Sequence, residues 1–91
     1  MPHVSLNKAQ LVARTRRISG QISGIERALE TGASCSDVLQ QVAAARGAIN
    51  GLMDEIVADH VREHVARPGL DDEDRSAAAE ELIAVIRRYA K

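Results

Sequence analysis

The stretch of sequence that decides the fold covers residues 34–68 and reads SCSDVLQQVAAARGAINGLMDEIVADHVREHVARP. Its apolar residues recur at helical spacing, and no helix breaker interrupts them before Pro68. Ser34 stands three residues before Asp37, which resembles a capping box at a helix start. The pattern therefore predicts one long helix over residues 36–65. Its apolar stripe consists of Val38, Leu39, Val42, Ala45, Ile49, Leu52, Met53, Ile56 and Val57.

The predicted central helix is too long for a small globule to cover. Thirty residues of helix span roughly 45 Å, whereas a chain of 91 residues has a radius of gyration of roughly 12 Å. The helix also carries small residues at 43, 44, 47, 48 and 51, which allow another helix to approach closely. We therefore expect a partner helix along its whole length.

Two shorter helices flank the central one. Apolar residues at helical spacing predict a first helix over about residues 6–29, ended by Thr31-Gly32. After Pro68-Gly69, the acidic residues 71–74 are typical of a helix start, and the helix that follows has an apolar face ending at Tyr89. There is no strand pattern and no repeat. The sequence thus predicts an all-α fold of three helices in a single domain, residues 1–91.

Composition narrows the classes of function. Tyr89 is the only aromatic residue, which argues against binding single-stranded nucleic acid by stacking. No apolar run approaches the roughly 18 residues of a membrane span, and no signal-peptide pattern begins the chain, so we expect a cytoplasmic protein. A single cysteine excludes an intrachain disulfide. Up to Met53, six basic residues face three acidic ones, so this half can present a positive face to DNA.

A sensor site is predicted from Cys35, His60 and His64. The two histidines are spaced i, i+4, so one helix face can offer both rings to one metal ion. Cys35 starts the same helix, 25 residues or about 37 Å before His60. The three side chains can meet only if two copies of the helix pack antiparallel, and two-fold symmetry then creates two identical sites. The competing interpretation makes Cys35 a small buried residue and both histidines ordinary surface residues.

The N-terminus adds two candidates. If Met1 is removed, the amine of Pro2 and the imidazole of His3 lie one residue apart and can chelate a metal ion. A thiolate, imidazoles and an amine suit Ni(II), Co(II), copper or Zn(II) rather than Mg²⁺ or Ca²⁺. Three or four ligands favour zinc, whereas six favour nickel or cobalt.

Three segments carry a family resemblance that covers essentially the whole chain. Residues 38–53, VLQQVAAARGAINGLM, resemble the signature of the CsoR/RcnR/FrmR repressors. Residues 14–22, RTRRISGQI, resemble their first helix, and residues 88–91, RYAK, resemble their C-terminus. The resemblance implies a three-helix protomer that forms an antiparallel homodimer and then a homotetramer. It also implies a repressor that binds double-stranded operator DNA and releases it when an effector binds, so that an efflux or detoxification operon is expressed.

The resemblance assigns roles to the candidate residues. Cys35, His60 and His64 fall on the inter-subunit effector site, and His3 falls where the nickel and cobalt branch has an additional ligand. The copper branch has cysteine where this chain has His64, so copper is disfavoured. The first interpretation is therefore a sensor of Ni(II) or Co(II), with Zn(II) as a further candidate.

Formaldehyde is the alternative effector. The formaldehyde-sensing branch resembles this chain in having Pro2 and Cys35. There the prolyl amine condenses with formaldehyde, and a thiolate of another subunit captures the iminium to leave a methylene bridge. This chemistry needs a secondary amine and a nearby thiolate but does not need His64.

The candidate DNA contacts lie mainly on the first predicted helix. Arg14 and Arg17 share one helix face, and arginine at such positions contacts phosphate or enters a minor groove. The full set is Lys8, Arg14, Arg17, Gln21 and Arg46. An enzyme is disfavoured, because Val61 follows His60 where a zinc hydrolase has its glutamate. A purely structural helical-bundle adaptor would leave the Cys/His set and the basic first helix unexplained.

Overall fold

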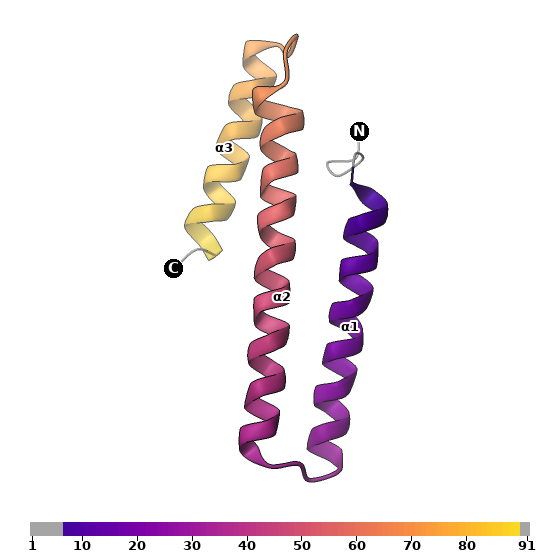
Figure 1. Cartoon of the computed structure of the whole chain (residues 1–91). Helices are drawn as coiled ribbons and strands as arrows, with labels where there is room; N and C mark the ends of the chain where they lie inside the picture. Colours follow the sequence, from indigo (N-terminus) through magenta and orange to yellow (C-terminus); the bar gives the residue numbers. More distant parts are fainter. Residues whose placement is uncertain (1–6, 90–91) are drawn as a thin grey trace. The chain divides into compact units, whose positions relative to one another are not determined.

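The computed structural model describes residues 7–89, and within that range it contains helices and no strand. The elements are α1 (Lys8–Glu30), α2 (Cys35–Val61), the short π-helical segment η1 (Arg62–Ala66) and α3 (Asp72–Tyr89), as Figure 1 shows. The predicted all-α fold of three helices is confirmed. None of the helices in the described range is long and apolar enough to cross a membrane.

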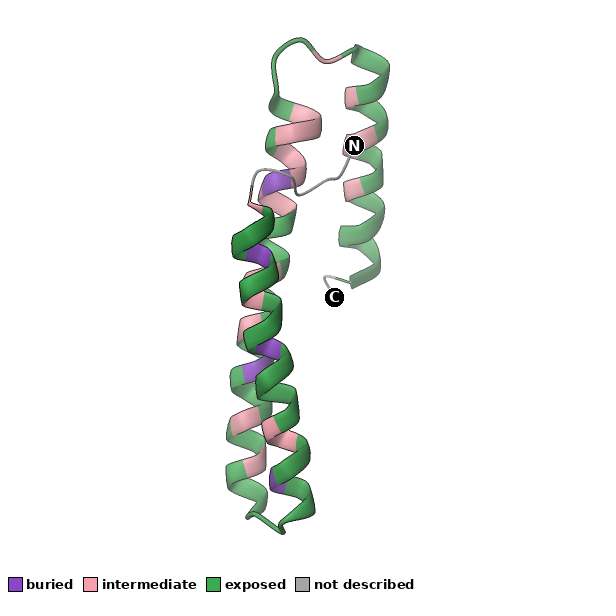
Figure 2. Cartoon of the chain, turned by 90° about the vertical axis from the view of Figure 1, so that its right-hand side faces the viewer, coloured by how far each residue is buried: buried purple, intermediate pink, exposed green. Residues whose placement is uncertain are grey.

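The chain divides into two compact units, one of which comprises residues 8–54. In this unit α1 and the first part of α2 run antiparallel as a helical hairpin (Figures 1 and 2). The chain reverses at Gly32, whose φ of 74° favours glycine, and Ala33 N donates to Ala28 O at 2.9 Å. Ser34 Oγ then accepts from Asp37 N at 3.1 Å, which caps α2 as the sequence predicted.

The apolar core of the hairpin is thin. Leu11, Ile18, Ala28 and Ala45 are its buried apolar residues, and Figure 2 colours buried positions purple. The predicted stripe of α1 is therefore only partly covered, since Leu29 is 64% exposed in the single chain. A single chain therefore leaves part of the apolar stripe on its helices exposed.

The other unit comprises residues 1–7 and 55–91, of which residues 7 and 55–89 are described. Here the end of α2 continues into η1, the chain reverses at Gly69, and α3 packs against η1. Asp71 Oδ1 accepts from Glu73 N at 3.1 Å and caps α3. The acidic start of the third predicted helix is confirmed.

The end of the central helix differs from the prediction. Regular α-helix was expected to residue 65, but it ends at Val61 and gives way to the wider π-helical turns of η1. No glycine or proline marks this change, and η1 is the segment that packs against α3. We attribute the altered turn to that packing, which overrides the local helix preference. His64 lies within η1.

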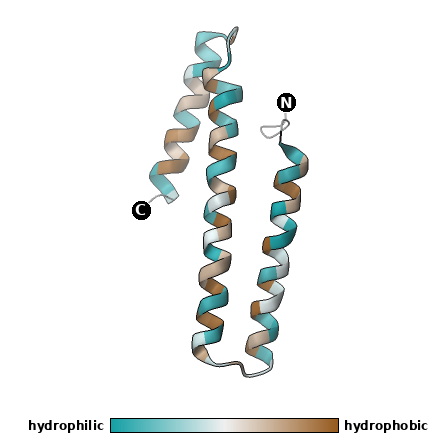
Figure 3. Cartoon of the chain, viewed as in Figure 1, coloured by the Kyte–Doolittle hydropathy of each residue, from teal (hydrophilic) through white to brown (hydrophobic). Residues whose placement is uncertain are grey.

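Many large apolar side chains remain exposed on all three helices. Figure 3 colours the most hydrophobic positions of the chain brown. They include Ile22 and Leu29 of α1, Leu39, Val42, Ile49 and Met53 of α2, and Ile83, Val85, Ile86 and Tyr89 of α3. Contiguous exposed apolar surface is typical of protein–protein contact sites.

Candidate functional site

His60 and His64 lie side by side at the end of α2 and in η1. Both are half-buried, their ring centroids are 5.2 Å apart, and the rings are tilted by 46°. Two imidazoles on one tetrahedral ion have centroids about 5 Å apart, because each metal–nitrogen bond is about 2.0–2.1 Å. The centroid distance matches that of two imidazoles on one ion, and it is also an ordinary spacing for i, i+4 neighbours on a helix.

The ring of His60 is held by α3. Its Nε2 lies 2.9 Å from the backbone oxygen of Ala78. A carbonyl oxygen can only accept, so Nε2 carries the proton and donates it, which assigns the lone pair of a neutral ring to Nδ1. Metal-binding histidines commonly use one ring nitrogen for the metal and the other for such an orienting hydrogen bond.

Cys35 is the first residue of α2, and its side chain is exposed. Cys35 is therefore not a buried residue of the single chain. Helix α2 is continuous from Cys35 to Val61. This is the helical continuity that the argument for a two-chain site requires.

The described residues of a single chain do not assemble a metal centre. Within residues 7–89, no three His, Cys, Asp or Glu side chains are grouped closely enough to hold an ion. The candidates Pro2 and His3 lie outside the described residues. The Cys35, His60 and His64 site across two chains stays a prediction.

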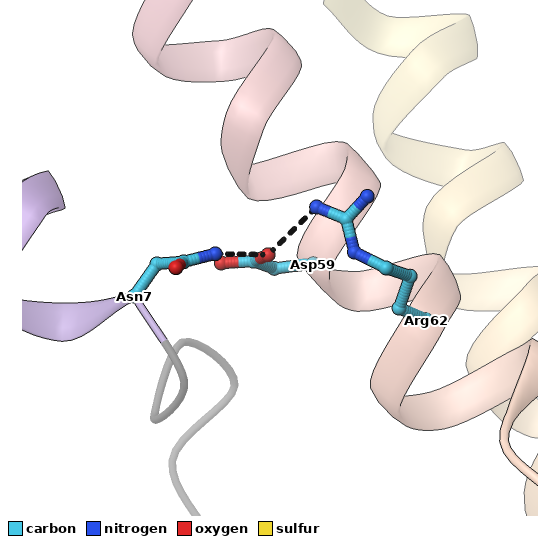
Figure 4. A network of polar contacts seen from close by, with 3 residues as sticks. All are labelled: Asn7, Asp59 and Arg62. Atoms are coloured by element: carbon cyan, nitrogen blue, oxygen red, sulfur yellow. Dashed lines mark hydrogen bonds and ion pairs between the residues drawn. The ribbon is translucent and has the colours of Figure 1, made fainter.

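Asp59 is a residue that sequence reasoning missed. Its side chain is only 1% exposed, and the sequence around it gives no signal that predicts this burial. Its Oδ1 accepts from Asn7 Nδ2 at 2.9 Å and from Arg62 Nη2 at 3.1 Å (Figure 4). No sequence motif predicts this contact, because Asn7 and Asp59 are 52 residues apart in the chain.

The predicted DNA-contacting residues gather partly around one groove of the hairpin. Its volume is about 660 Å³, and its lining comprises Arg14, Arg17, Ile18, Gly20, Gln21, Gly47, Ala48 and Gly51. Lys8 and Arg46 do not line it. The ion pairs formed among residues 7–89 all lie between residues 59 and 75, so the arginines of α1 form none there. Arg14, Arg17 and Gln21 thus share one surface. Among the described residues, no carboxylate forms an ion pair with either of its two arginines.

Comparisons with known proteins agree on one family. The family described as metal-sensitive transcriptional repressor matches residues 7–88. Over the full length of both chains, the protein is 48% identical to an uncharacterized protein in the bioA 5′ region of Serratia marcescens. It is 38% identical, again over both full lengths, to the transcriptional repressor RcnR of Salmonella arizonae.

A solved structure supports the same assignment. It is a glutamate-to-histidine variant of the formaldehyde-responsive regulator FrmR from Salmonella enterica serovar Typhimurium, 41% identical, with a TM-score of 0.88. The match covers 97% of this chain and 99% of the other. The chain therefore belongs to the metal-sensitive transcriptional repressor family, whose members bind operator DNA and are not enzymes.

Proposed function

We propose that this repressor releases its operator when an effector binds a site shared by two subunits. Cys35 of one chain and His60 and His64 of the other form the site, and His3 adds a ligand. Ni(II) or Co(II) is the primary effector, with Zn(II) as a further candidate. The observation that carries the proposal is the His60–His64 pair, half-buried with centroids 5.2 Å apart and oriented from α3.

The proposal requires an oligomer, and the exposed apolar surface supports one. Leu39 is 61% exposed and Leu29 is 64% exposed, and both lie on the hairpin. An antiparallel dimer would cover such residues and bring the start of one α2 against the end of the other. A dimer of dimers would then repeat the basic groove four times.

The ligand set suits the proposed metals. A thiolate and imidazoles select borderline transition metals over Mg²⁺ and Ca²⁺. When bound, the metal supplies a multivalent link that draws ligands from different segments together. The relative RcnR is named as a transcriptional repressor, and the family is described as metal-sensitive, which supports this class of effector.

DNA binding is assigned to Lys8, Arg14, Arg17, Gln21 and Arg46. Arg14, Arg17 and Gln21 line the groove of the hairpin, and guanidinium groups neutralise phosphates there. Repression and sensing are then linked equilibria, so the effector must bind the DNA-free conformation more tightly than the DNA-bound one.

Formaldehyde is a second candidate effector, favoured by the likeness to the formaldehyde-responsive regulator FrmR and by the exposed thiol of Cys35. With Met1 removed, the Pro2 amine, formaldehyde and one proton give an iminium ion and water, and the Cys35 thiol returns a proton when it becomes the attacking thiolate. Attack by the Cys35 sulfur of another subunit closes an N–CH₂–S bridge. The solved FrmR chain carries histidine at its position 64 only as an introduced change, whereas this chain has histidine there naturally, which favours the metal.

One titration separates the candidates. A duplex selected from a random library by the effector-free protein is labelled, and its release is followed by fluorescence anisotropy on adding Ni(II), Co(II), Zn(II), Cu(I) or formaldehyde. The proposal predicts release by Ni(II) or Co(II), abolished in both Cys35→Ala and His64→Ala and retained in the neighbouring control Ser36→Ala.

The other outcomes are equally informative. Release by formaldehyde that is abolished in Cys35→Ala but retained in His64→Ala would establish the alternative effector. Full effector-driven release by Cys35→Ala would contradict the proposed site for both effectors.

A further inference from the structure

Asp59 is a buried carboxylate that is only half satisfied. Its Oδ1 accepts hydrogen bonds from Asn7 Nδ2 at 2.9 Å and Arg62 Nη2 at 3.1 Å. Its Oδ2 is also buried and has no hydrogen-bond partner among residues 7–89. Burying a charge with one oxygen unsatisfied opposes folding. A neutral side chain would occupy this position at a lower desolvation cost. What the carboxylate adds is therefore its hydrogen bonds to the two donors.

The two donors differ in what they connect. Arg62 lies three residues further along the same chain segment and its side chain is 58% exposed, so its pair with Asp59 is a local contact. Asn7 lies 52 residues away and immediately precedes Lys8, the first residue of α1. The Asn7 contact is therefore the one that ties a distant part of the chain to the end of α2.

The neighbour of Asp59 is the candidate ligand His60. The side chain of Asp59 holds the residue before α1, while that of His60 holds the backbone of Ala78 in α3. Both hydrogen bonds join segments that lie far apart in the chain, 52 residues in one case and 18 in the other. Two consecutive residues at the end of α2 thus hold Asn7 and α3.

We propose that Asp59 is a positioning residue that transmits effector binding at His60 and His64 to α1 by way of Asn7. The effector step rests on the function proposed above, whereas the positioning of the α1 start does not. When the turn that holds His60 moves, the carboxylate one residue earlier moves with it, and its bond to Asn7 shifts or breaks. Lys8 follows Asn7 directly, and Arg14 and Arg17 lie on the same helix.

A polarity swap tests the contact. Asn7→Asp sets one carboxylate against another, and adding Asp59→Asn lets an amide at position 59 donate to a carboxylate at position 7. Asn and Asp cap helices equally well, so the exchange at position 7 does not weaken α1 by itself. Arg62→Gln is the matched control, because it removes the other hydrogen bond of Asp59 and leaves Asn7 in place.

The first measurement is hydrogen–deuterium exchange over the first turns of α1 in the effector-free protein. Asn7→Asp and Asn7→Ala should raise exchange there by about tenfold or more, the double variant should restore it, and Arg62→Gln should not change it. Unchanged exchange in Asn7→Ala, or no rescue in the double variant, would overturn the positioning role.

The second measurement is the ratio of DNA dissociation constants with and without Ni(II), or with formaldehyde if that is what releases the wild type. Asn7→Asp should lower this ratio by about fivefold or more, the double variant should recover it, and Arg62→Gln should stay within about twofold. An unchanged ratio alongside altered exchange would overturn the transmission step. A wild-type protein that no effector releases would overturn the proposed function, and exchange alone would then decide the role of Asp59.

Discussion

The guanidinium of Arg14 lies over Gly51. A Cβ atom added to Gly51 would stand 3.0 Å from Arg14 Nη1 and 3.8 Å from Arg14 Cζ. Both residues line the groove of the hairpin, so the absence of a side chain at position 51 sets where this guanidinium rests. The missing side chain at Gly51 of α2 therefore leaves room for Arg14, a predicted phosphate contact on α1.

Gly51→Ala should weaken DNA binding without weakening the fold. Alanine is favoured over glycine in a helix by about 0.5–1 kcal/mol, and the crowded atom is the end of a flexible side chain, so thermal stability should be unchanged or higher. DNA affinity should fall by roughly two- to tenfold, because displacing one phosphate contact costs on the order of 1 kcal/mol. Gly47→Ala is the control, since a Cβ there meets nothing within 4 Å. Equal DNA affinities for the two variants would show that the resting place of Arg14 is unimportant.

Arg17→Ala should change the salt dependence of DNA binding. Each phosphate that a side chain neutralises contributes about −0.9 to the slope of log K against log[salt], so the slope should become shallower by about that amount if Arg17 binds one phosphate. Arg16→Ala is the matched control, because Arg16 is an exposed neighbour that does not line the groove. Anisotropy titrations at several salt concentrations give both slopes. Parallel slopes for wild type and Arg17→Ala would remove Arg17 from the DNA interface.

Leu39→Glu should break the oligomer. Leu39 is 61% exposed in the single chain, and a charge buried at a subunit contact would be strongly unfavourable. The neighbouring Gln40→Glu adds the same charge at an exposed polar position and should leave assembly intact. Sedimentation equilibrium should give a lower mass for Leu39→Glu than for wild type and Gln40→Glu. Identical masses for all three would place Leu39 outside the interface.

The fold was largely predictable because its signals are local. The turn between α1 and α2 uses a positive φ at Gly32 and a helix cap at Ser34. Glycine and serine are residue types that predict such a turn and such a cap. The π-helical η1 was not predictable, because residues 62–66 contain no breaker and their turn depends on packing against α3.

The candidate site was predictable only in part. His60 and His64 are neighbours because of helical periodicity, which a sequence reveals. Asp59 and Ala78 were missed, because their roles come from contacts between segments far apart in the chain. The choice of effector depends on ligands from more than one subunit, and a single chain does not contain that arrangement.

The most direct test of the central claim is complementation of the site between subunits. Cys35→Ala and the double variant His60→Ala, His64→Ala should each fail to bind Ni(II) or Co(II) as pure proteins. Co-refolding equal amounts should restore about one quarter of the wild-type sites, because random pairing makes half of the dimers mixed and each mixed dimer keeps one of two sites. Isothermal titration calorimetry with Co(II) measures that stoichiometry. Recovery of about a quarter is the predicted result, and no recovery from properly mixed dimers would contradict a site shared between two chains.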